Sequence, residues 1–192
     1  MSIPSPQAGL PATGTVKAPL ALEASPAQYL TFQLGGEMFA VGILNIKEII
    51  EYGSVTEIPM VPPFIRGVIN LRGAVVPVID LASRFGGKRS EVSRRTCIVI
   101  IELTEGEERQ DIGVVVDSVS EVLEIPASEI EPPPAFGARI RADFIEGMGK
   151  VNGKFVIILD VAKVLSVDEI ASLSQLSGDA AADAAVGNPG QA

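Results

Sequence analysis

Asp80 and Asp160 are the residues of this chain whose type and spacing best suit acid–base chemistry. They end two similar apolar runs that lie 80 residues apart. Paired carboxylates from two related halves of a protein can share a proton and activate water, as in the aspartic proteases. In those enzymes a hydroxyl residue and a glycine follow the aspartate, whereas here Leu81-Ala82 and Val161-Ala162 follow. A hydrolase built on this pair is therefore kept as an alternative.

A structural interpretation of the same two aspartates is that each caps a short helix. Asp80 precedes Leu81–Phe85, which Gly86-Gly87 would end, and Asp160 precedes Val161–Leu165. A carboxylate at this position accepts hydrogen bonds from the free N–H groups of the first helical turn. This role explains why the aspartate recurs without requiring any catalysis.

The other residue types and motifs that commonly carry catalysis are missing, which argues against an enzyme. The chain has no histidine, which is the commonest general base and metal ligand. A single cysteine, Cys97, allows neither an intrachain disulfide nor a cysteine cluster for zinc. Its apolar surroundings, Ile98–Ile101, predict a small core residue. The sequence also lacks a phosphate-binding loop, so we expect no cofactor, no metal site and no catalytic residue.

Arg72 occupies the place that Asn152 has 80 residues later, and a glycine follows each of them. Asn-Gly suits a turn with positive φ at both central residues, and arginine is a poorer choice there. A type II turn with Gly73 in its second central position would hold Arg72 without strain. Two interpretations stay open: an ordinary exposed turn arginine, or a guanidinium presented to a carboxylate of a partner.

Glu48 and Glu121 each lie within an apolar run, Ile46–Ile50 and Val119–Leu123. Each glutamate could mark the solvated face of a short strand. Alternatively, an apolar ledge that carries one charge would suit the apolar face of a partner helix.

An internal repeat supplies the elements that must position these residues. The run from Ile65 to Ala82 recurs from Ile145 to Ala162 with its glycines and aspartate in step. Upstream, residues 46–51 match residues 119–124. Two copies of one supersecondary unit imply two similar subdomains that pack on each other. A seam between such halves is a natural binding place, and we expect an apolar cleft there.

Short strands separated by Gly and Pro turns dominate both copies, and this pattern suggests a mainly β fold with a small barrel that is repeated once. Ser166 and Glu169 have capping-box spacing, which predicts a C-terminal helix through Leu173. The predicted hairpins pair residues 29–34 with 37–41, 68–71 with 74–79, 97–103 with 110–116, and the strands on either side of Asn152-Gly153.

Composition narrows the possible partners. The chain has 192 residues with 24 acidic against 15 basic side chains, which argues against nucleic acid and anionic membrane surfaces. No apolar stretch approaches the roughly 20 residues of a membrane helix, and the N-terminus lacks signal-peptide features. We therefore expect a cytoplasmic protein with no direct membrane insertion. Residues 1–27 and 177–192 have the composition of disordered tails around a folded region 28–176.

The run Phe64–Gly73, followed by Val76–Leu81, resembles the signature of the CheW-type chemotaxis coupling proteins, and Gly113–Val119 and Phe144–Gly147 resemble that family's second half. The resemblance extends from about Tyr29 to Leu173. It implies two interleaved, five-stranded SH3-like β-barrel subdomains packed on each other, with short helices and a C-terminal helix. It also implies a non-enzymatic adaptor that joins the cytoplasmic tip of chemoreceptors, the methyl-accepting chemotaxis proteins, to the CheA histidine kinase.

In that family the receptor's helical hairpin lies against a groove between the subdomains. The residues implicated there, carried over by position, are Ile46, Glu48, Gly67, Arg72, Cys97, Val119 and Val122. The regulatory domain of CheA would contact the exposed barrel ends, where no individual residues are assigned. The resemblance implies recruitment to membrane-associated receptor arrays. The alternative is the same scaffold in a chemosensory pathway that controls surface motility or a second messenger.

Overall fold

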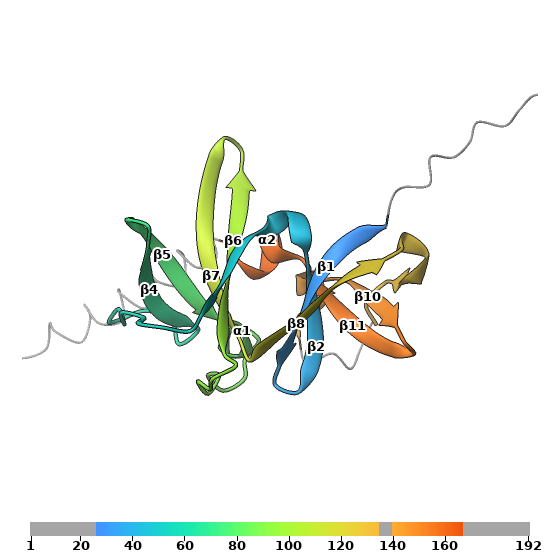
Figure 1. The fold of residues 1–192 in the computed structure, drawn as a ribbon, viewed down its shortest axis with the longest axis horizontal. Helices are drawn as coiled ribbons and strands as arrows, with labels where there is room; N and C mark the ends of the chain where they lie inside the picture. The colour runs from blue at the N-terminus through green and yellow to red at the C-terminus, as the bar shows by residue number, and fades with distance from the viewer. Residues whose placement is uncertain (1–25, 135–139, 167–192) are drawn as a thin grey trace, which may run out of the picture.

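The computed structural model describes residues 26–134 and 140–166, and most of them lie in two sheets (Figure 1). The β1 sheet has six strands in the order β8-β1-β2-β11-β10-β9, and the β6 sheet has five in the order β3-β6-β7-β5-β4. The strands are β1 (Ala27–Leu34), β2 (Glu37–Gly42), β3 (Ile46–Glu51), β4 (Ile65–Leu71), β5 (Ala74–Asp80), β6 (Cys97–Glu105), β7 (Glu108–Val116), β8 (Ser118–Ile125), β9 (Ile130–Glu131), β10 (Ile145–Val151) and β11 (Lys154–Leu159). The helices are α1 (Leu81–Arg84) and α2 (Val161–Val164), with 3₁₀ turns η1 (Ile43–Asn45), η2 (Ala127–Glu129) and η3 (Ala142–Phe144).

The four predicted hairpins are confirmed, namely β1–β2, β4–β5, β6–β7 and β10–β11. Their turn residues explain the pairing. Gly35 and Gly36 both have positive φ, at 59° and 84°, which a two-residue turn matched to the strand twist requires. Leu34 and Glu37 consequently face each other directly across the turn.

The two copies of the repeat exchange their first hairpins. The β1–β2 hairpin joins β8, β10 and β11, whereas the β6–β7 hairpin joins β3, β4 and β5. Parallel pairs, β2 with β11 and β7 with β5, connect each hairpin to its host sheet. Each sheet therefore takes strands from both halves of the chain, so neither copy of the repeat makes up a subdomain by itself.

Consecutive segments of chain bring the two edges of each sheet toward each other. β9 follows β8 after four residues and pairs with β10, where Ile130 lies opposite Gly149. In the β6 sheet, Thr56 follows β3 and exchanges two backbone hydrogen bonds of 2.9 Å with Val68 of β4. Both sheets thus have the arrangement of a small, partly open barrel, as the sequence predicts.

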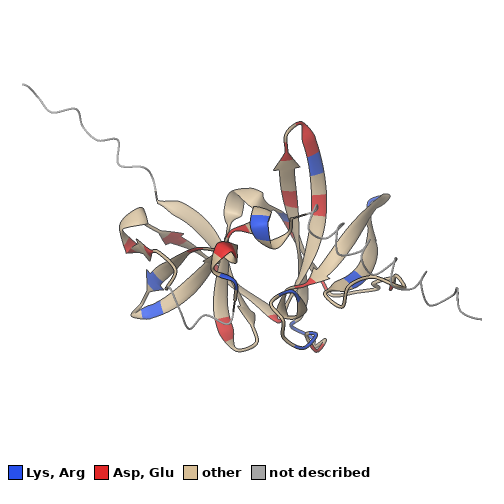
Figure 2. Cartoon of the chain, turned by 180° about the vertical axis from the view of Figure 1, so that it is seen from behind, with Lys and Arg blue, Asp and Glu red and all other residues tan. Residues whose placement is uncertain are grey.

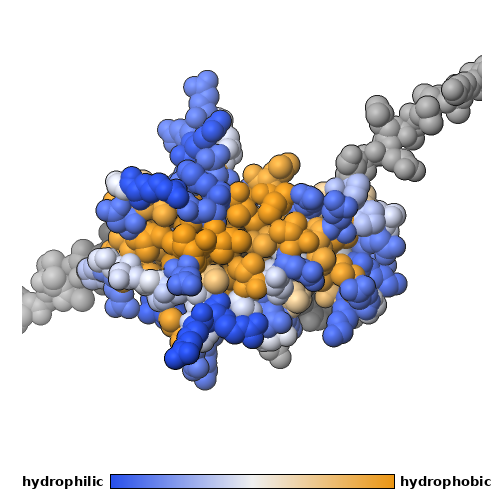
Figure 3. Space-filling model, in the orientation of Figure 1, coloured by the Kyte–Doolittle hydropathy of each residue, from blue (hydrophilic) through white to orange (hydrophobic). Residues whose placement is uncertain are grey.

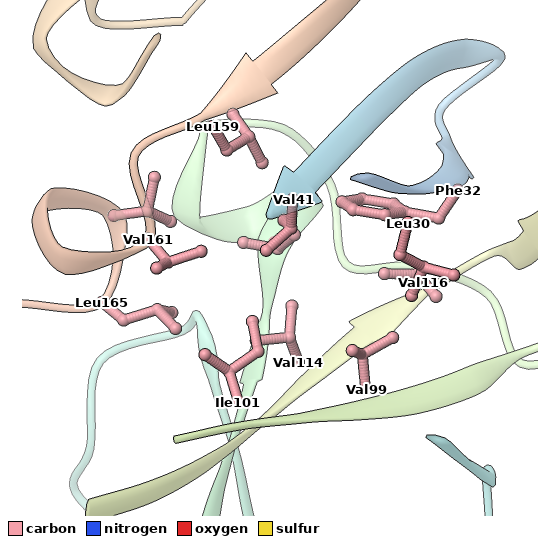
Figure 4. A pocket seen from close by; sticks show the side chains of 12 residues that line it. Leu30, Phe32, Val41, Val99, Ile101, Val114, Val116, Leu159, Val161 and Leu165 are labelled. Atoms are coloured by element: carbon pink, nitrogen blue, oxygen red, sulfur yellow. The ribbon is translucent and has the colours of Figure 1, made fainter. Parts of the chain in front are cut away.

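The junction between the sheets is the largest buried apolar cluster. Side chains of both sheets meet there, including Phe32 and Val41 of the β1 sheet and Val99 and Val114 of the β6 sheet (Figure 4). The apolar side chains around the centre of the junction leave a cavity of about 10 Å³, the room of a single water. The subdomains therefore share one continuous core at this junction.

Several predicted features fall outside the described residues. The predicted N-terminal tail does so except for Pro26 and Ala27, and Ala27 begins β1. The predicted C-terminal helix, apart from Ser166, and the tail 177–192 also lie outside. Within the two described stretches, no helix has the length and apolar character needed to cross a bilayer.

Candidate partner-binding surface

Asp80 and Asp160 each cap a helix, as predicted. The backbone N–H of Ser83 donates to Asp80 at 3.1 Å, and that of Lys163 donates to Asp160 at 3.2 Å. Asp80 is fully buried and also accepts hydrogen bonds of 2.9 Å from the Nε of Arg66 and from the backbone N–H of Ser90. Each carboxylate accepts a hydrogen bond from the first turn of its own helix. The hydrolase alternative would need the two carboxylates to share a proton, and these contacts give it no support.

The charged groups around the two aspartates differ. Glu146 takes the place in the second copy that Arg66 has in the first. Partial desolvation, and next to it the charge of Asp160, raise the pKa of Glu146 above its ordinary value, although the residue still reaches solvent. The buried Arg66–Asp80 ion pair therefore has no counterpart in the second half, where Asp160 pairs instead with the exposed Lys163 at 3.5 Å. In the part of the chain that the structure describes, no group of three or more acidic or cysteine side chains could hold a metal ion.

Arg72 has positive φ, and the predicted type II turn is wrong. Its φ is 51° and that of Gly73 is 88°, closely matching Asn152 at 51° and Gly153 at 76°. Both hairpins thus use a turn with two left-handed residues, a conformation that suits Asn and Gly but disfavours arginine. Strained backbone of this kind clusters at functional sites, which motivates a functional hypothesis for the side chain. The turn therefore supports a functional interpretation of Arg72.

The guanidinium of Arg72 is paired within the chain. Its Nη1 donates to Oε1 of Glu48 at 2.6 Å and its Nη2 donates to Oε2 at 3.0 Å. This two-pronged contact raises the pKa of Arg72, first through the hydrogen bond and then through the charge of Glu48. Glu48 thus engages one N–H of each terminal nitrogen, and the contact of Arg72 with a partner's carboxylate stays a prediction.

Apolar side chains lie near and on β3, the strand that carries Glu48, and on β8 of the other sheet. They include Leu44 on η1, Ile46 and Ile49 on β3, and Val119 and Val122 on β8; we call these five residues the ledge. Leu44 is 97% exposed, and Ile49 and Val122 are nearly half exposed. Figure 3 shows a continuous apolar band across this face, over the region where β3 and β8 run in Figure 1. The ledge therefore takes residues from both subdomains.

The predicted cleft between the subdomains is wrong in its form. The apolar side chains from both sheets that line the junction (Figure 4) leave a cavity of only about 10 Å³ between them, so a partner cannot enter the seam. Ile46, Cys97 and Val119 pack against the outside of that junction core and are only partly buried. The surface open to a partner is thus a shallow strip along the rim of the seam, not a groove through it.

Gly67 acts through its backbone. It is buried, its φ is 143°, and a Cβ added there would lie 2.0 Å from the carbonyl oxygen of Thr56. Only glycine allows Thr56 to come close enough to pair with β4. Gly67 therefore shapes the edge of the β6 sheet, and it offers no side chain to a partner.

Charge limits the ledge on one side. The β6–β7 hairpin projects from the body and carries several acidic residues (Figure 2). Lys47 of β3 donates to Asp111 of this hairpin at 2.7 Å, and Glu102 lies 3.9 Å from the same nitrogen. The hairpin is thus fixed beside β3, and it places a negative border next to the apolar strip.

Two features of this surface are not among the residues and contacts predicted from the sequence. Leu44 lies outside the repeat, in a 3₁₀ turn between strands, where the only available signal was an apolar residue with no strand neighbours. The contact between Glu48 and Arg72 joins residues 24 positions apart, and no spacing rule predicts it.

Comparison with known proteins places this arrangement in a family. Residues 28–169 match the family model described as a CheW-like domain. The chemotaxis protein CheW of Klebsiella aerogenes is 34% identical over 158 residues, which cover 82% of this chain and 93% of that protein. Protein FrzA of Myxococcus xanthus is 31% identical over 149 residues, covering 76% and 90%.

A solved structure shows the same architecture. The scaffolding protein TtCheW from Thermoanaerobacter tengcongensis matches with a TM-score of 0.67 at 36% identity, covering 77% of this chain and 93% of that one. The mainly β architecture and the family resemblance predicted from the sequence are therefore confirmed, and the chain belongs to the CheW-like domain family.

Proposed function

We propose that this protein is a non-enzymatic adaptor that couples chemoreceptors to the CheA histidine kinase at membrane-associated receptor arrays. The similarity to proteins named chemotaxis protein CheW and to a scaffolding protein supports this role. The observation that carries it is the Glu48–Arg72 pair beside a ledge that spans both subdomains. A helical hairpin from a receptor tip is the proposed occupant of that ledge.

Burial of the ledge would supply most of the affinity. Leu44, Ile49 and Val122 are exposed in the free protein, and removing apolar surface from water contributes about 25 cal/mol per Å². Neighbouring helices present apolar side chains at the spacing of helical turns, which suits a narrow strip of this kind. Ile46 and Val119 would form the partly buried base of the ledge, and Cys97, another predicted contact residue, packs against the same junction core.

Arg72 would fix the orientation of the bound hairpin. A guanidinium has five N–H donors, and Glu48 engages one on each terminal nitrogen, so others stay available to a receptor carboxylate or carbonyl. A partner that covers the pair would also remove water from it and strengthen it. Glu48 would thus hold Arg72 in position before the receptor arrives.

The kinase would bind the two far ends of the molecule. The β4–β5 and β10–β11 hairpins lie at opposite ends in Figure 1. Each exposes one apolar side chain next to its turn, Val75 at 74% and Phe155 at 52%, and these are equivalent positions of the repeat. We assign them to contacts with the regulatory domain of CheA. Phe155→Ser should weaken binding to the kinase and leave binding to the receptor unchanged.

Reconstitution tests the function as a whole. Purified kinase and a receptor cytoplasmic fragment are assayed for phosphorylation with and without this protein. We expect kinase activity to depend on the receptor only when the protein is present. If kinase activity in the presence of the receptor fragment is the same with and without this protein, at every ratio of protein to kinase, the proposal is contradicted. The similarity to FrzA is compatible with an adaptor of a different chemosensory pathway, and in that case receptors of that pathway alone would support coupling.

A further inference from the structure

We infer that Arg84 is a positioning residue that sets the orientation of the two subdomains and thereby aligns the two parts of the ledge. The first half of this inference stands on the contacts of Arg84 alone. The second half rests on the proposed receptor-binding function. Arg84 lies in neither the ledge nor the Glu48–Arg72 pair.

The side chain of Arg84 crosses from one subdomain to the other. It leaves the end of α1, beside the β6 sheet, and its Nε donates to the backbone oxygen of Val164 in α2 at 3.0 Å. Its guanidinium carbon lies 5.0 Å from the ring centre of Phe64 and 4.9 Å from that of Phe144. One planar cation thus contacts an aromatic ring of each subdomain, an arrangement that favours the charged group.

These contacts join equivalent positions of the repeat. Phe64 and Phe144 lie 80 residues apart, and so do Arg84 and Val164. The contacts of Arg84 therefore lie where equivalent parts of the two subdomains face each other. A second arginine at position 164 would bring two cations together, and the second copy has valine there. The next residue, Phe85, extends the same bridge, because its ring stacks at 5.8 Å on Phe39 of the β1 sheet.

The hydrogen bond of Arg84 adds a directional contact to this junction. The remaining core there is aliphatic and aromatic, and apolar packing favours burial without strongly specifying an angle. A hydrogen bond weakens steeply when its geometry is bent, so the bond to Val164 resists rotation of one subdomain against the other. Because β3 belongs to one sheet and β8 to the other, such a rotation would misalign Ile49 and Val122.

The test measures the distance between the subdomains directly. Spin labels are attached at Ala74→Cys and Lys154→Cys, which are exposed and equivalent positions, one in each sheet, in a Cys97→Ala background. Arg84→Met removes the cation and the hydrogen bond, and Arg84→Lys keeps only the charge. Arg141→Met is the matched control, since its guanidinium lies 4.7 Å from the same Phe144 ring but on the β1-sheet side.

We expect a shifted or broadened label distance in Arg84→Met, partial recovery in Arg84→Lys, and the wild-type distance in Arg141→Met. Without labels, the Arg84→Met affinity for a receptor cytoplasmic fragment should fall roughly 2- to 30-fold, the range of coupling through a distant residue. A wild-type distance in Arg84→Met would overturn the positioning role. An altered distance with unchanged affinity would overturn the link to the ledge, whereas wild-type protein that binds no receptor would refute the proposed function instead.

Discussion

Arg72 and Glu48 form a two-pronged ion pair, 2.6 and 3.0 Å long, between the β4–β5 turn and the edge strand β3. The arginine side chain is 74% exposed, whereas that of glutamate is 22% exposed. The carboxylate thus anchors a guanidinium that otherwise faces solvent. Exposed ion pairs contribute little to stability, so we expect the fold to depend little on this pair.

Replacing Arg72 by Asn should separate stability from binding. Arg72→Asn introduces the residue that the second copy has at the same φ of 51°, and it removes an unfavourable left-handed arginine. We expect thermal unfolding at the wild-type temperature or above it, measured by circular dichroism. A large loss of stability would mean that the ion pair holds the fold together.

Leu44 offers a test of the ledge that does not depend on charge. Because its side chain is 97% exposed, Leu44→Ser should leave the free energy of unfolding unchanged. Its affinity for a receptor fragment should fall roughly fivefold or more, as for an anchoring interface residue. Val92→Ser, at a position that is 53% exposed outside the ledge, is the control. If both variants bind the receptor fragment with the wild-type affinity, Leu44 does not belong to the receptor-binding surface.

Gly67→Ala should damage the fold much more than a comparable change elsewhere. The new Cβ would lie 2.0 Å from the carbonyl oxygen of Thr56, and backbone atoms there would have to move. We expect a loss of roughly 3 kcal/mol or more in the free energy of unfolding. Gly153→Ala also places alanine at positive φ but meets no atom within 4 Å, so it should cost roughly 1–2 kcal/mol. Equal losses in urea titrations would contradict the close approach.

The two capping aspartates should differ in their contribution to stability. Asp80→Ala leaves the Arg66 guanidinium without its buried partner and should cost roughly 3–5 kcal/mol. Asp160→Ala removes only a partly exposed cap and should cost roughly 0.5–2 kcal/mol, whereas Asp160→Asn keeps a good cap. Denaturant unfolding of the three variants gives the ranking. Similar losses for Asp80→Ala and Asp160→Ala would show that the Arg66 contact adds nothing.

Glu146 predicts a pH-dependent difference in stability. Its pKa is higher in the folded chain than in the unfolded one, so its carboxyl favours folding only while it is protonated. That contribution is fully present below the ordinary value of 4.5 and is lost as pH rises through the raised pKa. Glu146→Gln should therefore be more stable than the wild type near pH 7, and the difference should shrink on acidification. If the difference in stability between Glu146→Gln and the wild type grew at low pH, this explanation would be contradicted.

The hairpins and the caps could be predicted because their signals are local. Asn152-Gly153 specifies a turn by its own conformational preferences, and an aspartate before α1 or α2 satisfies N–H groups only three residues away. The exchange of hairpins could not be predicted in the same way. The repeat makes β2 and β7 similar, so the choice between β11 and β5 as parallel neighbour depends on packing across the whole molecule.

The site was predicted less completely than the fold, for a related reason. The composition of the turn indicated that Arg72 was unusual, but its partner Glu48 lies on a strand that turn rules do not reach. An open cleft was expected because the repeat predicts that two subdomains meet, but it does not predict which side chains fill the junction between them. Phe32, Val99 and their neighbours fill it, and the partner surface is displaced to the rim. The role of Arg84 could not be predicted because basic residues are common at the ends of short helices. Only its contacts across the junction distinguish it from them.

Calorimetric titration of a receptor cytoplasmic fragment into the wild type and into Arg72→Asn tests the central claim most directly. If the ledge and the Glu48–Arg72 pair form the receptor-binding surface, the wild type binds and the variant binds at least roughly tenfold more weakly at equal thermal stability. Identical affinities of the two proteins, both fully folded, would contradict it.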